Sequence, residues 1–188
     1  MSSFERIAQD IGISPILSEI EDNRHLFGEF SARTDAYGSP HGEIKDIWVR
    51  YGDISAMVES GDYSGIADEH ESIWLQDLPE AKKICYKVMS MVGGDRLGGV
   101  LITTLPMGGK ISPHVDGGWH AAYYDKYYVP IKNKPGSVFG FADGVIDPDV
   151  GDVWKFDNSI LHWVNNDSDS ERIAMIICIK GGLSCLGE

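Results

Sequence analysis

The sequence predicts a mainly β protein, a sandwich or jelly roll with helices of the N-terminal part packed on the sheet. Two observations favour the β architecture: after Gly94, short runs rich in β-branched and aromatic residues follow one another, and turn-rich clusters rather than helical patterns separate them. A third observation places the helices, because apolar residues at helical spacing occur in two stretches before Gly94.

The N-terminal part is predicted to contain helix, loop and one β-like segment. Ser14 followed by Pro15 is typical of a helix start, and the apolar residues after it recur at helical spacing. Residues 43–51 are rich in β-branched and aromatic residues and are predicted to be extended. A second helix is predicted over 78–92, ending at Gly93-Gly94.

The C-terminal part is predicted to be a succession of short strands. These strands cover residues 99–105, 111–116, 123–131, 137–141, 152–156, 162–164 and 172–180. No repeat or change of composition marks a linker, so residues 1–188 are interpreted as a single domain. Its helical and mixed N-terminal part covers 1–95, and its jelly-roll core with a metal site covers 96–182.

Composition and charge exclude several classes of partner. Lys and Arg number 16 against 29 Asp and Glu, which gives a net charge of −13 and predicts that the protein binds neither nucleic acid nor an anionic membrane. Three cysteines without metal-like spacing predict a reducing compartment, the cytoplasm. The N-terminus has no apolar signal region, and no run is apolar enough to span a membrane. The oligomeric state stays open.

A candidate metal site lies in the β region, in the sequence Pro113-His114-Val115-Asp116. Residues i and i+2 of a strand project from one face, so His114 and Asp116 can offer a nitrogen and an oxygen to one ion. A single pattern of this kind also occurs by chance, as a hydrogen-bonded surface pair. His162 supplies a third candidate ligand, and two His with one carboxylate leave coordination positions open for a cosubstrate and dioxygen on Fe(II).

Arg172 is predicted to stand beside this site. A hairpin with its tip at Asp167 would place His162 and Arg172 opposite each other, on the same face of the sheet. A solitary Arg on an otherwise apolar strand favours an acidic ligand, because a guanidinium forks onto a carboxylate. In the alternative interpretation Arg172 pairs with Asp169 or Glu171 at the turn.

The residues His114-x-Asp116, His162 and Arg172 on a predicted jelly roll resemble the iron(II)- and 2-oxoglutarate-dependent dioxygenases. Within this class the chain is most similar to the aspartyl/asparaginyl β-hydroxylase family, which includes bacterial proline hydroxylases. The resemblance extends over about residues 97–180 and is carried by segments 106–114, 151–159 and 162–166. It implies a cupin-like double-stranded β-helix, Fe(II) held by His114, Asp116 and His162, and 2-oxoglutarate as cosubstrate with its 5-carboxylate on Arg172.

The resemblance also assigns further cosubstrate contacts. Animal members of the family lack the acidic metal ligand, whereas Asp116 is present here, as in the proline hydroxylases. Where the family tends to have Arg-x-His, this chain has Lys126 and Tyr128, which can offer a charge and a hydrogen bond to the cosubstrate. Thr103 stands where a cosubstrate-contacting serine is expected.

The implied reaction is hydroxylation of an unactivated C–H bond of an amino acid or peptidyl side chain (Asp, Asn or Pro-like), with release of succinate and CO2. The substrate itself is not evident from the sequence. Candidate substrate contacts, some on an expected lid after the metal motif, are Arg33, His41, Arg50, Trp119 and His120. Each of these residues is also compatible with a packing or surface role.

Two other functions stay open at this point. The barrel could be a non-enzymatic, cupin-like small-molecule or metal-binding protein in which Arg172 has no role. It could also be a zinc- or manganese-dependent isomerase or hydrolase, because the same ligands accept several first-row metals.

Overall fold

The computed structural model describes residues 2–31, 33–52 and 73–181. All strand pairs are antiparallel, and they form two sheets. The large sheet has the order β1 (Phe4–Ala8), β9 (Val153–Phe156), β6 (Asp125–Lys132), β11 (Arg172–Gly181), β4 (Gly94–Leu105), β2 (Lys45–Tyr51), β3 (Ile73–Trp74). The small sheet has the order β5 (Lys110–His114), β10 (His162–Asn166), β7 (Ser137–Phe141), β8 (Gly144–Ile146).

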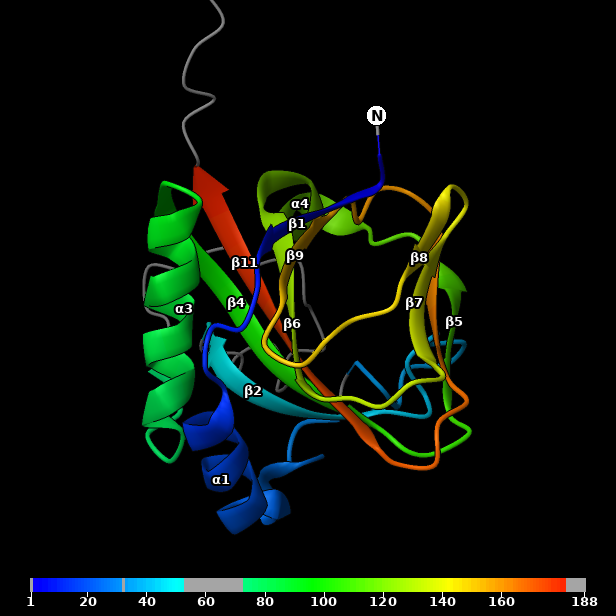
Figure 1. Ribbon diagram of the computed structural model, residues 1–188, viewed down its shortest axis with the longest axis horizontal. Coiled ribbons are helices and arrows are strands. Elements are labelled where there is room, and N and C mark those ends of the chain that lie inside the picture. Colours follow the sequence, from blue (N-terminus) through cyan, green and yellow to red (C-terminus); the bar gives the residue numbers. More distant parts are fainter. Residues whose placement is uncertain (1, 32, 53–72, 182–188) are drawn as a thin grey trace, which may run out of the picture.

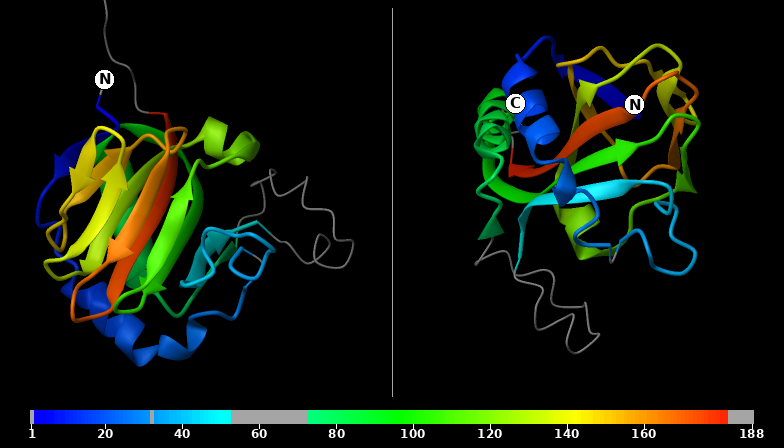
Figure 2. Two further views of the ribbon diagram at one scale, coloured as in Figure 1. Left: turned by 90° about the vertical axis from the view of Figure 1, so that its right-hand side faces the viewer. Right: turned by 90° about the horizontal axis from the view of Figure 1, so that it is seen from below.

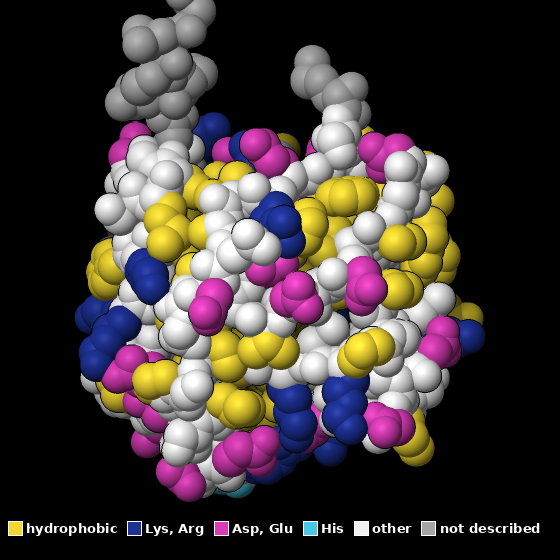
Figure 3. All heavy atoms as spheres, viewed as in Figure 1, with side chains coloured by type: hydrophobic (Ala, Val, Ile, Leu, Met, Phe, Trp, Pro, Cys, Tyr) yellow, Lys and Arg dark blue, Asp and Glu magenta, His cyan; other side chains and the backbone are white. Residues whose placement is uncertain are grey.

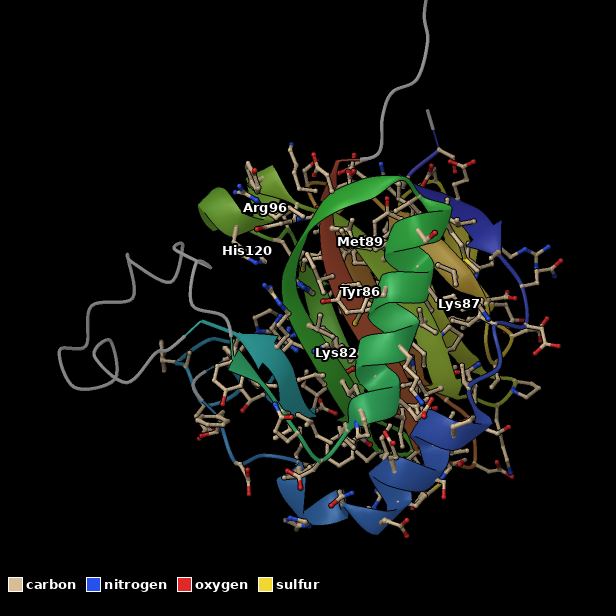
Figure 4. All side chains as sticks on the ribbon, turned by 90° about the vertical axis from the view of Figure 1, so that its left-hand side faces the viewer. Lys82, Tyr86, Lys87, Met89, Arg96 and His120 are labelled. Carbon is tan, nitrogen blue, oxygen red and sulfur yellow. The ribbon has the colours of Figure 1, made fainter. Side chains whose placement is uncertain are left out.

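The two sheets face each other, and the helices α1 and α3 cover the outer side of the large sheet (Figures 1 and 2). The described helices are α1 (Ser14–Asp22), the 3-10 helix η1 (Arg24–Leu26), α3 (Pro79–Met91) and the short α4 (Gly118–Tyr123). Figure 4 shows α3 lying across the large sheet, with Tyr86 and Lys87 on the helix and His120 on the separate α4. The predicted jelly roll with N-terminal helices packed on its sheet is confirmed.

Strand alternation in the large sheet produces two cores. Alternate residues of β11 point outward and pack against the helices α1 and α3. This cluster contains Ile173, Met175, Ile177 and Ile179 of β11, Ile16 and Ile20 of α1, and Ile84 and Val88 of α3. The inward residues Ala174 and Ile176 join the cluster between the two sheets, with Tyr128 and Phe139. Because the period of a strand is two, Arg172 shares the inward face with Ala174. An arginine thus enters the space between the sheets.

Both predicted helices are confirmed, and each has a proline in its first turn. The N-terminal part also contributes to the barrel more than its sequence indicates. Residues 4–8, predicted to be helix or loop, form the edge strand β1 on β9, because an edge strand with one neighbour needs no strict alternation of apolar residues. The short strands β3 and β8 were not predicted.

The predicted hairpin between His162 and Arg172 is wrong. His162 on β10 pairs with His114 and Phe141 in the small sheet, whereas Arg172 on β11 pairs with Leu105 in the large sheet. The segment between them crosses from one sheet to the other. The fully buried Asn166 organises this crossing: its Nδ2 lies at hydrogen-bond distance from the carbonyls of Leu105, Pro106 and Ser170, and its Oδ1 accepts from Ser168 Oγ.

Two further observations concern the molecule as a whole. On the face shown in Figure 3, Lys and Arg side chains are interspersed with acidic and apolar ones. Within the described part of the chain, none of the helices has both the length and the apolar character that a membrane span requires.

Candidate metal centre

One cavity of about 330 Å³ opens between the two sheets, a volume typical of a small-molecule site. The predicted site residues that line it are Arg33, His41, Arg50, Thr103, His114, Asp116, His120, Lys126, His162 and Arg172. Residues from both halves of the chain therefore meet at one place. The side chain of Trp119 lies outside the described part of the structure.

His114 and His162 come together because they are direct partners across β5 and β10. Their ring centroids are 4.3 Å apart. Each Nδ1 lies 2.8 Å from a backbone carbonyl oxygen, that of Ser112 for His114 and that of Ile160 for His162. A carbonyl only accepts hydrogen bonds, so both Nδ1 atoms carry a proton, and the neutral form of each ring has its lone pair on Nε2.

Asp116 directs one carboxylate oxygen towards these lone pairs. Its Oδ1 lies 3.5 Å from His114 Nε2 and 4.0 Å from His162 Nε2. Its Oδ2 accepts a hydrogen bond of 2.9 Å from Lys126 Nζ. Its backbone N–H donates to the carbonyl of Asn158, on the connection between β9 and β10. Both ends of the residue are thus held in place.

The surroundings of Asp116 and His162 favour the protonation states in which these two groups can bind a cation. Burial favours the neutral form of Asp116, but the contact with His114 and the charge of Lys126 outweigh it and lower the pKa of the carboxyl. Burial lowers the pKa of His162, assisted by His114. Two imidazole nitrogens and one carboxylate that converge on one point are the donor set that first-row divalent metals bind. The residues therefore fit such an ion.

Arg172 and Tyr128 form a second polar group in the same region. Arg172 is 3% exposed, and its guanidinium carbon lies 5.0 Å from the centre of the Tyr128 ring. Arg172 Nε and the Tyr128 hydroxyl are buried and have no hydrogen-bond partner among the described residues. Burial raises the pKa of Tyr128, so its hydroxyl stays protonated. Within the described part of the chain Arg172 forms no ion pair with Asp169 or Glu171; Asp169 pairs with Lys134, and Glu171 pairs with Arg24 and Lys132.

Thr103 and Lys126 occupy the wall of the large sheet. Thr103 is buried on β4 and lies opposite Ala174 of β11 and Asp46 of β2. Lys126 lies opposite Cys178 of β11 and is directed to Asp116. Burial alone would lower the pKa of Lys126, but the neighbouring Cys178 and Asp116 raise it, so the side chain is cationic.

The predicted substrate residues reach the cavity in different ways. Arg33 donates from Nε and Nη2 to the two oxygens of Asp46, both at 2.9 Å. Arg50 Nη1 donates to the carbonyl of Gly98 at 2.7 Å. His120 Nε2 accepts from the N–H of Gly99 at 3.4 Å. The charge of Arg33 is matched by a fully buried carboxylate.

His41 lies much closer to the metal ligands than its sequence position indicates. Its ring packs perpendicular to that of His114 with centroids 4.7 Å apart, and potential ligand atoms of His41, His114 and Asp116 lie within 4.8 Å of one another. Burial and the neighbouring Arg33 and His114 lower the pKa of His41 to about 3, so the ring is neutral.

Sequence reasoning missed the residues that support and line the outer part of the cavity. Asp46 anchors Arg33, and Trp48 and Tyr51 line the cavity beside Phe30, with ring centroids 5.5 to 6.4 Å apart. The signal available was the alternation of 45–51, which places Asp46, Trp48 and Arg50 on one face of β2. That face could not be assigned to the cavity without the pairing of β2 with β4.

Fold and site together define a class of protein. A double-stranded β-helix with two imidazoles and a carboxylate at its opening, and a buried arginine on the facing sheet, is the architecture of the 2-oxoglutarate-dependent oxygenases. The family model of aspartyl/asparaginyl β-hydroxylase matches residues 54–180, more than half of the chain, and the protein belongs to this family. The predicted enzyme class, a 2-oxoglutarate-dependent hydroxylase, is thereby confirmed. No curated protein sequence matches the chain.

Solved structures support the fold. A prolyl hydroxylase from Trichoplax adhaerens, in complex with a hypoxia inducible factor peptide, superposes with a TM-score of 0.64 at 13% identity, over 95% of this chain and 83% of its own. A viral collagen prolyl hydroxylase from Paramecium Bursaria Chlorella virus-1 gives 0.61 at 13% identity, over 96% and 97%. A Pseudomonas putida prolyl-4-hydroxylase gives 0.53 at 12% identity, over 95% and 92%.

Proposed function

We propose that this protein is an iron(II)- and 2-oxoglutarate-dependent oxygenase that hydroxylates an unactivated C–H bond of an amino acid or peptidyl side chain, of Asp, Asn or Pro type, and releases succinate and CO2. One observation carries the proposal. Two imidazole Nε2 atoms face a single oxygen of Asp116 at 3.5 and 4.0 Å, in a cavity that a buried arginine also lines.

In this proposal His114 and His162 bind Fe(II) through Nε2 and Asp116 binds it through Oδ1. The Ser112 and Ile160 carbonyls hold the two imidazoles in the required tautomer, and Lys126 holds the other oxygen of Asp116. The bound iron and 2-oxoglutarate supply the activation of dioxygen that C–H hydroxylation needs. The chain itself contributes orientation and a largely apolar enclosure.

Arg172 and Tyr128 bind the 5-carboxylate of the cosubstrate in this proposal. Both lie on the inner side of the large sheet, and a buried guanidinium without a carboxylate partner among the described residues calls for an anionic ligand. Thr103 lines the same wall and can add a hydroxyl contact. The ammonium of Lys126 is bonded to Asp116, so its main role in this proposal is to hold that metal ligand and not to bind the cosubstrate.

Basic side chains of the cavity lining are the proposed contacts of the substrate. Arg33, Arg50, Lys126 and Arg172 line the cavity, whereas Asp116 is the only acid among its described lining residues. Asp46, behind the wall, matches Arg33, and Asp116 matches Lys126. A substrate with a carboxylate, as in an amino acid or an acidic side chain, fits a lining that contains guanidinium groups. Arg50 and His120 are the proposed contacts.

The experiment is anaerobic titration of the metal-free protein with Fe(II) and 2-oxoglutarate, followed by a screen for succinate release over amino acids and peptides. We expect a visible metal-to-ligand charge-transfer band, which needs both partners on one metal. A folded, iron-loaded sample without the band contradicts the proposal and favours a binding protein or another metal enzyme. Of the remaining expectations, we propose a cytoplasmic location and no nucleic-acid or membrane partner.

A further inference from the structure

The centre contains more nitrogen donors than the proposed ligand set uses. His41 belongs to the loop between η1 and β2, far in sequence from His114 and His162. Its ring lies edge-on to the His114 ring at 4.7 Å, only slightly farther than the 4.3 Å between His114 and His162. Its candidate ligand atom lies within 4.8 Å of those of His114 and Asp116.

The backbone around His41 is tied to the strand that carries His114. Ser112 N–H donates to the carbonyl of Pro40 at 3.1 Å, and Lys110 N–H donates to a carboxylate oxygen of Glu43 at 3.0 Å. Ser39 Oγ accepts from the N–H of His41 at 3.1 Å. These contacts lie on both sides of His41 in the chain. They hold the loop that carries His41 against β5.

His41 differs from His114 and His162 in what holds its second nitrogen. A backbone carbonyl accepts the Nδ1 proton of each of the other two rings. His41 has no such acceptor: its Nδ1 is buried without a hydrogen-bond partner among the described residues, and its Nε2 lies 3.4 Å from Arg33 Nη1, which can only donate. When either nitrogen of His41 binds a metal, the proton on the other has no acceptor.

From this arrangement we propose that His41 is an additional, exchangeable ligand of the metal centre, which binds the ion in the absence of cosubstrate and leaves it when 2-oxoglutarate binds. The inference rests on the proposed function. Without an acceptor for its second nitrogen, His41 is the weakest imidazole of the three, because outer-shell partners contribute about 10- to 100-fold to metal affinity. A chelating dianion therefore displaces His41 and leaves His114 and His162 bound.

Proton NMR of the full-length protein loaded with Co(II) tests this proposal. Each coordinated imidazole gives one strongly shifted N–H signal that disappears in D2O, so the signals count the histidine ligands. We expect three signals without cosubstrate and two with saturating 2-oxoglutarate. His41→Gln should give two signals in both states and a several-fold tighter binding of 2-oxoglutarate to the Co(II) protein, because the competing ligand is gone.

The controls separate the possible failures. His120→Gln removes another histidine of the same cavity and should retain three signals. Two signals in the wild-type protein in both states, or three that persist with 2-oxoglutarate, overturn the role of His41 and leave the proposed function intact. The absence of any shifted signal would contradict the metal centre itself. Circular dichroism of His41→Gln and of a second variant, His41→Phe, shows whether each is folded.

Discussion

At the scale of single residues, several polar side chains of the cavity are held in place by a specific hydrogen-bond or ion-pair partner. The imidazoles of His114 and His162 are fixed by carbonyls, Asp116 by Lys126, and Arg33 by Asp46. Arg172 Nε, the Tyr128 hydroxyl and His41 Nδ1 are among the exceptions, because each is buried without a hydrogen-bond partner among the described residues. A buried charge without an acceptor costs stability, and proteins retain such groups where a ligand completes them.

The first prediction concerns Arg172. Arg172→Ala should weaken binding of 2-oxoglutarate about 30- to 150-fold, the effect of losing a charge-assisted hydrogen-bonded pair of about 2 to 3 kcal/mol. The affinity for Fe(II) or Co(II) should change little, because Arg172 lies on the sheet opposite the two imidazoles. Isothermal titration calorimetry measures both constants. Equal affinity for 2-oxoglutarate in variant and wild type would refute the anchoring role.

The second prediction concerns Lys126. Lys126→Met leaves the carboxylate of Asp116 without its cation, and we expect the metal-free protein to lose about 2 kcal/mol of unfolding free energy. A divalent metal should then stabilise the variant more than the wild type, because the ion takes over as partner of Asp116. Urea unfolding with and without Co(II) measures this. Lys155→Met, which breaks the exposed pair with Asp125, is the control and should cost under about 1 kcal/mol.

At the scale of elements, the structure depends on contacts between parts distant in the chain. Glu171, next to the start of β11, accepts from Arg24 of η1, Lys132 of β6 and Thr104 of β4. It therefore ties the N-terminal helical part to the centre of the large sheet. Burial alone would raise the pKa of Glu171, but Arg24 and Lys132 outweigh it and lower the pKa to about 2.

A third prediction follows for the pH dependence of stability. The pKa of Glu171 is about 2 in the folded protein and near its ordinary value of 4.5 when unfolded. Its contribution to stability is therefore complete above pH 4.5 and is lost as the pH falls towards 2. Glu171→Gln should lower the unfolding free energy by about 1 to 2 kcal/mol at pH 7, and the difference should shrink below pH 4.5. Urea midpoints at pH 7, 5 and 3.5 measure it; a constant difference would contradict the assignment.

At the scale of the whole molecule, the proposed ligands belong to both sheets. His114 and His162 lie on the small sheet, and Thr103 and Arg172 lie on the large sheet. A cosubstrate that binds the metal at one end and Arg172 at the other would join the two layers. Ligand binding should therefore be visible in the stability of the complete fold.

A fourth prediction concerns the effect of metal and cosubstrate on the melting temperature. Metal with 2-oxoglutarate at about 100 times its Kd should add about 2.7 kcal/mol to the stability of the metal-bound protein, or several degrees in Tm. Arg172→Ala should retain the increase caused by metal alone and lose most of the cosubstrate increment at the same concentration. Differential scanning fluorimetry under nitrogen measures both steps. A full increment in the variant would show that the cosubstrate does not use the large sheet.

Much of the fold and of the site could be predicted from local patterns. Helical spacing and a proline in the first turn located α1 and α3, and runs of β-type residues located most strands of the barrel. The spacing of His114 and Asp116 placed both on one side of a strand and its extension, and the solitary Arg172 on an apolar strand pointed to a buried cation. The structure brings all of these residues to one cavity.

The pairing of distant strands could not be predicted in the same way. The assumption of a hairpin around Asp167 placed Arg172 opposite His162, whereas the actual partner of His162 is His114. The difference lies in the connection 167–171. Asn166, just before it, binds the carbonyl of Leu105 on β4, and Ser168 within it binds the carbonyl of Ser170. A local pattern contains no information about which sheet a strand enters after such a connection.

The sequence alone determined the chemistry available to this protein, namely its imidazoles, its carboxylate and its buried guanidinium, because side-chain alternation along a strand is a local property of the backbone. Only the tertiary structure decided which groups meet. It paired His114 with His162, set Lys126 against Asp116, and brought His41 to the centre on a loop bound to β5. The physical reason is that contacts between distant segments depend on the packing of the two sheets together.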